Sequence, residues 1–341
     1  MLSIHNSLRK LGRLSKGIPN LSCGFFFAAA MIGTALSVPA RAQINFNTPI
    51  QLVDNDANQG SPTLVEFNGS VALYYVNHSN NTIYVDIGLT GNPQSTGIVV
   101  NSAELTDVGA VVLNGDVLIS YVSSAGNVTF ALSSNGVSFS SGVIPTGSSL
   151  GLPGGVSPNT AFIPAMVNDA GTVYVATVSA ANNEIYMSKT TNGTTFTPLN
   201  SPTQPVDGNP TTSRPSMTLW QGNPWLAFTS GSSRVAIVGN VLVPSSFDQA
   251  TLSSWGNSNR NSNYAGICLL NYGNTDLYIF GQSTASSQQL LYTVNSGGGW
   301  STPAQVGNQM RWTPTLILTS GQVVVLAYQD DGNTNISYRS N

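Results

Sequence analysis

The sequence is poor in cysteine and in charged residues. It contains two cysteines in 341 residues, Cys23 and Cys268, which excludes the disulfide framework that stabilises many small secreted domains. Lys, Arg, Asp and Glu together make up 7% of the positions, where a soluble domain usually carries about 25%. Asn, Ser, Thr and Gly supply the polarity instead. We interpret Cys268, in the apolar run GICLL, as a small buried hydrophobic residue rather than a nucleophile.

The first 42 residues carry a different signal from the rest of the chain. An apolar run over positions 21–38 is followed by Ala40-Arg41-Ala42, the small-x-small pattern that a signal peptidase accepts. Four basic residues precede it, Arg9, Lys10, Arg13 and Lys16. We therefore predict that residues 1–42 are a signal peptide cleaved after Ala42, and that the mature protein is secreted or periplasmic. An uncleaved membrane anchor is the alternative, because the apolar run approaches the length that crosses a bilayer.

The charge that remains after this segment is acidic. Residues 1–42 hold five of the eleven Lys and Arg residues and none of the fourteen Asp and Glu residues. The mature chain therefore has six basic side chains against fourteen acidic ones, a net charge of −8. This balance argues against a nucleic acid or an anionic membrane as partner, because both need a basic face.

Repetition is the strongest feature of the mature chain. Six segments share one layout: a short apolar strand, a Gly-centred turn, a longer alternating strand, a polar turn and a third strand. The turn glycines are Gly69, Gly115, Gly171, Gly222, Gly273 and Gly321. They recur about every 50 residues, and the apolar positions alternate without helical periodicity. This combination is typical of the blades of a β-propeller.

Two similar segments lie near the two ends of the mature chain. FNTPIQL at 46–52 matches WSTPAQV at 300–306, which supplies the fourth strand of the fifth repeat. The sixth repeat ends at Asn341 after its third strand, so the N-terminal segment can fill the missing place. We predict an all-β fold in which residues 43–341 form a single domain, a six-bladed β-propeller whose N-terminal strand closes the last blade.

Turns between third and fourth strands carry a further motif. TVNSGGGW at 293–300 fits the Asp-box pattern SxDxGxxW, with Thr for Ser and Asn for Asp. SSNGVSF at 133–139 and KTTNGTTF at 189–196 are more degenerate copies. The mature chain therefore resembles the sialidase-like, Asp-box six-bladed propellers. In that family the box is a folding device on the face opposite the active site, with its aromatic ring tucked between strands, so the resemblance implies a fold and not an activity.

The resemblance also implies a chemistry that the sequence only partly matches. Sialidases use an arginine triad that binds a sugar carboxylate, a Tyr nucleophile paired with Glu, and an Asp acid. The one match to the arginine motif is Ser213-Arg214-Pro215, in the fourth repeat, and no Arg occurs between Arg41 and Arg214. The arginine of an early blade is thus absent. Arg214, Arg260 and Arg311 are the candidates to converge, because each lies in or beside a loop that enters an inner strand.

The leading interpretation is a monomeric, carbohydrate-binding, lectin-like propeller. Its partner is a glycan or polysaccharide, bound at the face where the loops enter the inner strands and the central funnel opens. Sugars need flat aromatic faces for their C–H surfaces and planar polar groups for their hydroxyls. The predicted ligand-binding residues are Arg214, Trp255, Arg260, Tyr264, Arg311 and Trp312. In the alternative, the two tryptophans fill blade interfaces and the arginines pair with nearby acids.

A glycoside hydrolase of the sialidase-like fold is the second interpretation. Such an enzyme needs two carboxyl groups across the funnel, about 5–9 Å apart depending on the mechanism. Glu104 and Asp107, in the loop that enters the second repeat, are the candidate catalytic residues. A surface adhesion or scaffold protein that uses the sides of the propeller is the third interpretation.

Neither carbohydrate interpretation needs a cofactor, and one loop has some features of a metal site. Asp54, Asp56 and Asn58 alternate along DNDANQG as the oxygen ligands of a calcium loop do. Gly60 and Glu66 both fall one place later than the spacing of an EF-hand demands. A plain turn into the first inner strand is the alternative to calcium at this loop.

Overall fold

The computed structural model of the chain consists of strands, with one short 3₁₀ turn, η1 (Ser148–Leu150). Among the residues that it describes, no helix is long and apolar enough to span a membrane. The described residues are 44–52, 60–77, 79–101, 107–153, 162–199, 206, 208, 210–211, 213–230, 236–243, 246–250, 266–282, 289–310, 313–329 and 335–341.

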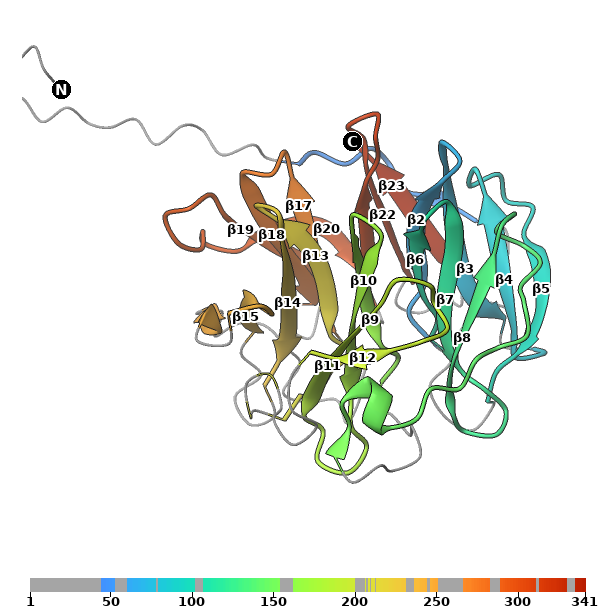
Figure 1. The fold of residues 1–341 in the computed structure, drawn as a ribbon. Helices are drawn as coiled ribbons and strands as arrows, with labels where there is room; N and C mark the ends of the chain where they lie inside the picture. The colour runs from blue at the N-terminus through green and yellow to red at the C-terminus, as the bar shows by residue number, and fades with distance from the viewer. Residues whose placement is uncertain are drawn as a thin grey trace, which may run out of the picture. The chain divides into compact units, whose positions relative to one another are not determined.

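The strands form six antiparallel sheets, one for each predicted blade, and Figure 1 shows the blades in chain order from blue to red. The first three blades are β2 (Thr63–Phe67), β3 (Ser70–Asn77), β4 (Thr82–Ile87) and β5 (Gln94–Val99); β6 (Gly109–Leu113), β7 (Asp116–Val122) and β8 (Val128–Ser133); and β9 (Ala165–Asp169), β10 (Thr172–Val178), β11 (Ile185–Thr190) and β12 (Thr197–Pro198). The last three are β13 (Ser216–Trp220), β14 (Asn223–Thr229), β15 (Ala236–Asn240) and β16 (Asp248–Ala250); β17 (Ile267–Tyr272), β18 (Asp276–Gln282), β19 (Gln289–Asn295) and β20 (Ala304–Gln309); and β21 (Thr315–Leu318), β22 (Val324–Gln329), β23 (Ile336–Ser340) and β1 (Ile50–Gln51). The predicted all-β, six-bladed propeller is confirmed.

The innermost hairpin of each blade turns tightly. Asn68 and Gly69 have φ angles of 50° and 73°, and Asn114 and Gly115 have φ angles of 53° and 90°. These left-handed values are tolerated best by Asn and Gly, which is why such pairs mark hairpins in the sequence. In the sixth blade the left-handed residue is Gln322, with φ of 62°, rather than the predicted turn glycine. The tight turns fix the register between the two inner strands.

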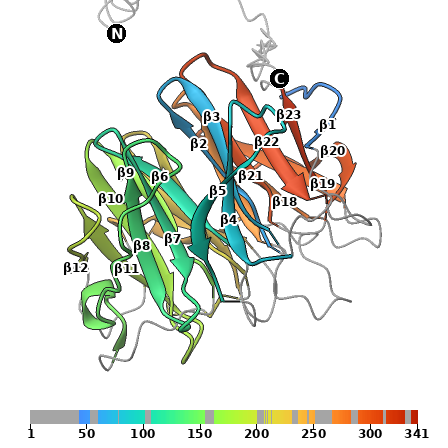
Figure 2. The same cartoon turned by 90° about the vertical axis from the view of Figure 1, so that its right-hand side faces the viewer.

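The N-terminal segment closes the ring. β1 pairs antiparallel with β23, with Ile50 opposite Tyr338, and so takes the outer place of the sixth blade (Figure 2). Two further backbone bonds extend this pairing: Asn47 N–H donates to Ser340 O at 2.8 Å, and Leu52 N–H donates to Ile336 O at 3.0 Å. β20, which begins at Ala304 within the matching segment 300–306, holds the equivalent outer place of the fifth blade. The two similar segments, 46–52 and 300–306, therefore both supply the outermost strand of a blade, as predicted.

The core lies between the blades. Among the described residues, six hydrophobic clusters form, and each joins one pair of neighbouring blades. The alternating strands produce this arrangement, because successive side chains point toward the blade on either side. Ile44 packs between the fifth and sixth blades and Leu52 between the sixth and first, each only 6% exposed. The N-terminal segment thus contributes side chains to both interfaces of the blade that it completes.

The turns that carry the box-like motif share an asparagine acceptor. Asn135 Oδ1 accepts the N–H groups of Val137 and Ser138 at 2.9 and 2.8 Å. Asn192 Oδ1 accepts the N–H groups of Thr194 and Thr195 at 3.0 and 2.8 Å. In each turn, one side-chain oxygen satisfies two backbone donors that face no neighbouring strand.

The aromatic residues that end these turns differ in burial. Phe196 is 6% exposed, and its ring centroid lies 4.4 Å from that of Phe130 on the second blade. Trp300, which ends the best match to the motif, is only partly buried. How closely a turn matches the motif therefore does not predict how deeply its aromatic ring is buried.

Replacement of Phe196 by Ala is expected to cost about 3–5 kcal/mol of unfolding free energy, the usual range for a buried large aromatic residue. Trp300→Ala is the matched comparison, with a smaller expected cost because part of its ring already faces solvent. Urea unfolding of both variants, followed by circular dichroism, measures the difference. An equal or larger loss for Trp300→Ala would contradict this ranking.

Candidate functional site

The connections between strands divide over two faces of the propeller. The six innermost strands are β2, β6, β9, β13, β17 and β21. We call the face at which these strands begin the funnel face, and the face at which they end in tight hairpins the turn face. The loops that contain the predicted ligand-binding and catalytic residues lead into innermost strands, so the funnel face is where the candidate site is expected.

Two adjoining cavities lie between the innermost strands. The first, of about 110 Å³, includes Pro62, Arg214 and Thr313, which precede their strands and so place it at the funnel face. The second, of about 460 Å³, includes Glu66 and Leu318, which place it toward the turn face. The two share Leu64, Ala110, Met166, Met217, Leu269 and Leu316, one residue from each innermost strand. Both cavities therefore lie along the axis of the ring, which we call the axial channel, the larger one toward the turn face and the smaller one at the funnel face, whose end we call the channel mouth.

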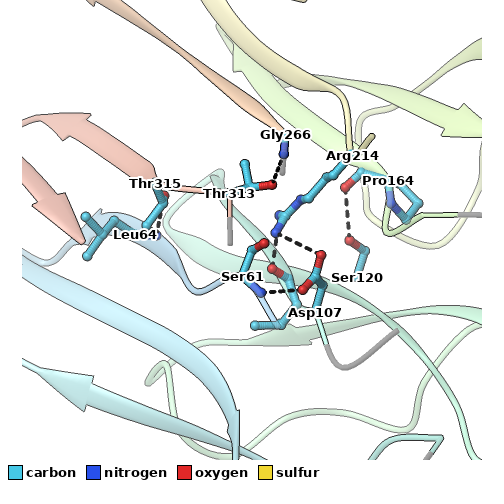
Figure 3. Close-up of polar contacts among 10 residues, drawn as sticks. Ser61, Leu64, Asp107, Ser120, Pro164, Arg214, Gly266, Thr313 and Thr315 are labelled. Atoms are coloured by element: carbon cyan, nitrogen blue, oxygen red, sulfur yellow. Dashed lines mark hydrogen bonds and ion pairs between the residues drawn. The ribbon is translucent and has the colours of Figure 1, made fainter. Parts of the chain in front are cut away.

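Arg214 extends across this mouth from the fourth blade to the second. Its Nη2 donates a hydrogen bond to Val108 O at 3.1 Å, and its Nη1 lies 3.8 Å from Asp107 Oδ2 (Figure 3). The other carboxylate oxygen of Asp107, Oδ1, accepts the backbone N–H of Ser61, which precedes the first blade. The side chains of Arg214 and Asp107 are each 12% exposed. One buried ion pair therefore joins three blades at the channel mouth.

The environment of Asp107 favours its neutral form. Burial raises the pKa of the Asp107 carboxyl above its ordinary value, while the Arg214 guanidinium and the hydrogen bonds from Ser61 act in the opposite direction. A raised carboxyl pKa suits a general acid, but a carboxylate that holds a buried arginine also has a structural role. The predicted catalytic role of Asp107 stays a prediction.

Hydroxyl groups connect the remaining blades around the mouth. Thr313 Oγ1 accepts the N–H of Gly266 at 2.8 Å, and Thr315 Oγ1 accepts the N–H of Leu64 at 3.2 Å (Figure 3). Ser216 Oγ accepts the N–H of Leu269 at 2.9 Å. These backbone donors lie on the inner edges of the innermost strands, where no strand partner is present. The Ser and Thr residues of the segments TPT at 313–315 and RPS at 214–216 therefore join neighbouring blades, a role that sequence reasoning missed.

Of the predicted site residues, the structure brings Asp107 and Arg214 together. Arg214 pairs with Asp107, as in the alternative interpretation in which the arginines pair with nearby acids. The remaining predicted residues lie outside the described part of the chain: Glu104, Trp255, Arg260, Tyr264, Arg311 and Trp312. Their convergence at the mouth stays a prediction. Cys268 is buried and lines the channel, as its interpretation as a small hydrophobic residue requires, and burial raises the pKa of its thiol.

The predicted calcium loop also falls outside the described residues at Asp54, Asp56 and Asn58. Within the described ranges, no group of three or more His, Cys, Asp or Glu side chains is arranged to hold a metal ion. The calcium hypothesis is therefore untested.

Comparison with known proteins identifies the fold class. No protein-family model and no curated protein sequence matches the chain. A protein of unknown function from Dyadobacter fermentans superposes with a TM-score of 0.60 at 10% identity, over 87% of this chain and 98% of that one. Trypanosoma rangeli sialidase in complex with 2,3-difluorosialic acid gives a TM-score of 0.59 at 9% identity, over 86% of this chain and 59% of the sialidase. The SapL1 lectin in complex with α-methyl fucoside gives 0.50 at 14% identity, over 81% of this chain and 90% of the lectin.

At these identities the similarity shows a shared fold and nothing more about chemistry. It confirms, at the level of fold, the resemblance to the sialidase-like six-bladed propellers.

Proposed function

We propose that this protein is an exported carbohydrate-binding propeller that recognises a glycan at its funnel face. In this proposal residues 1–42 are removed as a signal peptide, and the mature protein acts as a monomer outside the cytoplasm. The observation that supports the proposal is that described residues next in sequence to the predicted binding residues line the channel mouth. Thr313, which directly follows Trp312 in the sequence, lines the mouth, and Ile267, which closely follows Tyr264, lines it too.

The chemistry of these loops suits a sugar. Trp255, Tyr264 and Trp312 provide aromatic faces for C–H surfaces, and Arg260 and Arg311 provide planar donors for hydroxyl groups. The shared fold of a lectin seen with a fucoside and of a sialidase seen with a sialic acid derivative supports the proposal. Pairing with Asp107 leaves Arg214 a supporting role at the mouth rather than a free cation.

An array of glycans and plant or microbial polysaccharides tests the proposal. The double change Trp255→Ala and Trp312→Ala is expected to weaken binding more than tenfold, about 1.4 kcal/mol, because two stacking faces are lost. Leu242→Ala, at a residue 48% exposed on the turn face, is the matched surface control. Thermal unfolding of each variant shows that the fold is intact. Binding that survives the double change in a folded protein would contradict the funnel assignment.

A glycoside hydrolase is the second candidate, favoured by the raised pKa of the Asp107 carboxyl at the channel mouth. The same array, analysed for released sugars, separates the two. Turnover that Asp107→Asn and Glu104→Gln abolish in folded protein supports an enzyme, whereas retention without turnover supports a lectin. Neither binding nor release on the panel would favour the adhesion or scaffold interpretation. Repeating the measurements with EDTA and then calcium tests the loop at Asp54.

A further inference from the structure

The cavity of about 460 Å³ toward the turn face takes no part in the proposed function. Three successive residues of each innermost strand line it, so that its wall is about 10 Å tall at the usual rise of a strand. The residues form three layers around the axis, which we call the deep, middle and outer layers, counted toward the turn face. Small-molecule sites have volumes of about 300–1,000 Å³. The cavity is therefore large enough to hold a small organic molecule.

The deep and middle layers are apolar. The deep layer consists of the six residues shared with the smaller cavity, and all six are apolar. The middle layer is apolar except at Thr218, and its other members are Val65, Val111, Val167, Leu270 and Ile317. Val111, Val167 and Ile317 are partly exposed, although such residues inside a protein are usually fully buried. Apolar surface thus remains open to the cavity.

The outer layer, next to the hairpins, is mixed in polarity. It consists of Glu66, Val112, Asn168, Leu219, Asn271 and Leu318. Asn168 Oδ1 accepts the N–H of Gly171 at 3.0 Å, and Asn271 Oδ1 accepts the N–H of Asn274 at 3.0 Å, so both oxygens stabilise their own hairpins. Glu66 is the one ionisable residue among the described residues that line the cavity. The cavity is therefore apolar inside and has a single carboxylate at its turn-face end.

Neutral donors hold the Glu66 carboxylate in place. The N–H of Ser320 donates to Oε2 at 2.6 Å, and the Ser320 hydroxyl donates to Oε1 at 2.5 Å. Both oxygens therefore accept, as an ionised carboxylate does, and an ionised carboxylate has about four acceptor positions in total. In the part of the chain that the structure describes, no Lys, Arg or His forms an ion pair with Glu66. Its negative charge is thus not neutralised by a described side chain.

The surrounding hairpins add negative charge. The segments that form the inner hairpins contain Glu66, Asp116, Asp169 and Asp276 but no Lys, Arg or His; they are 63–77, 109–122, 165–178, 216–229, 267–282 and 315–329. A surface with charges of one sign attracts the opposite charge and repels its own. Within the described ranges, no three His, Cys, Asp or Glu side chains are grouped as ligands for a metal ion. The charge pattern therefore favours an organic cation.

We propose that this turn-face cavity is a second binding site, for a small organic ammonium ion with an apolar body. The apolar body occupies the deep and middle layers, where it covers side chains that otherwise face water. The ammonium group donates a charge-assisted hydrogen bond to the Glu66 carboxylate. A neutral molecule of the same shape lacks that bond, and an anion places its charge beside Glu66. The site goes beyond the proposed function and is independent of it, because none of the predicted ligand-binding residues lines this cavity.

Three compounds of similar shape test the role of charge: 4-phenylbutylamine, 4-phenylbutanol and 4-phenylbutanoate. Isothermal titration calorimetry of the protein in about 0.15 M salt measures their affinities, since this ionic strength screens distant charges. The amine is expected to bind about tenfold more tightly than the alcohol, and the carboxylate more weakly than either. Glu66→Gln keeps an acceptor for Ser320 but removes the charge. It is expected to weaken amine binding about tenfold and to change alcohol binding less than about twofold.

Two further variants test the location. Asp276→Asn is the matched control, because it removes one negative charge from the same face at a residue that does not line the cavity. It is expected to change amine binding less than about twofold. Leu219→Trp places a larger side chain in the outer layer, the layer that contains Glu66. It is expected to weaken binding of the amine and of the alcohol more than about tenfold, because the indole takes up cavity volume. Thermal unfolding shows whether each variant is folded.

Any of four results overturns the proposal: no binding of the amine, carboxylate binding as tight as amine binding, unchanged amine binding in folded Glu66→Gln protein, or unchanged amine binding in folded Leu219→Trp protein. If Leu219→Trp does not fold, the comparison of Glu66→Gln with Asp276→Asn still decides. The titrations contain no sugar, so the absence of glycan binding at the funnel face contradicts the proposed function without affecting this site.

Discussion

Deletion of residues 43–52 is expected to destabilise the whole propeller rather than one end of it. Ile44 and Leu52 are buried in the two interfaces that flank the sixth blade, and the ring of Phe46 contacts Phe280 edge-on with centroids 6.3 Å apart. Burial of each such side chain contributes about 1.5–3 kcal/mol. Their combined loss approaches the total stability of many domains, about 5–15 kcal/mol. Deletion also exposes the edge of β23.

A pair of isoleucines in the same segment provides the control. Ile44 is 6% exposed and Ile50 is 54% exposed. Ile44→Ala is expected to cost about 2–5 kcal/mol, and Ile50→Ala no more than about 0.5 kcal/mol. Urea unfolding monitored by circular dichroism measures both, and thermal unfolding measures the deletion. A truncated protein that melts cooperatively at the temperature of the intact protein would rule out closure of the ring as a source of stability.

Replacement of Arg214 by Ala should cost about 3–5 kcal/mol, the range seen when one partner of a buried ion pair is removed. Without the guanidinium, Asp107 remains buried with only Ser61 as a described donor, and Val108 O loses the hydrogen bond from Arg214. The double change Arg214→Met and Asp107→Leu is expected to cost less than Arg214→Ala, because it leaves no unpaired charge. Chemical denaturation of the single and double variants checks this order.

The cost of Arg214→Ala should also depend on pH. Arg214 lowers the pKa of Asp107, so its removal raises that folded-state pKa further above the unfolded value. A group with a raised folded pKa contributes stability that is present below the unfolded pKa, about 3.9, and is lost as pH rises through the folded pKa. The variant therefore loses more stability than the intact protein as pH rises. The difference in unfolding free energy between the intact protein and the Arg214→Ala variant should be larger at pH 7.5 than at pH 5. An equal difference at the two pH values would contradict the coupling.

The number of blades, their order and the closure of the ring could be predicted from the sequence, because each depends on local patterns. Alternation with a period of two, Gly-centred turns and a repeat of about 50 residues describe one blade at a time. The match between residues 46–52 and 300–306 identified the segment that completes the sixth blade. The acidic balance of residues 43–341 and the burial of Cys268 likewise followed from composition and local context.

Only the tertiary structure decided which distant residues meet. Ser61, Asp107 and Arg214 belong to the entrances of three different blades, and the ring brings them to one channel mouth. Trp220 and Trp300 come from different repeats and pack in one hydrophobic cluster because neighbouring blades pack face to face. Burial also depends on the partner blade, which is why Phe196 is more buried than Trp300 although its turn matches the motif less well. Local patterns determine each blade, whereas contacts between blades depend on the angle and spacing at which the closed ring sets them.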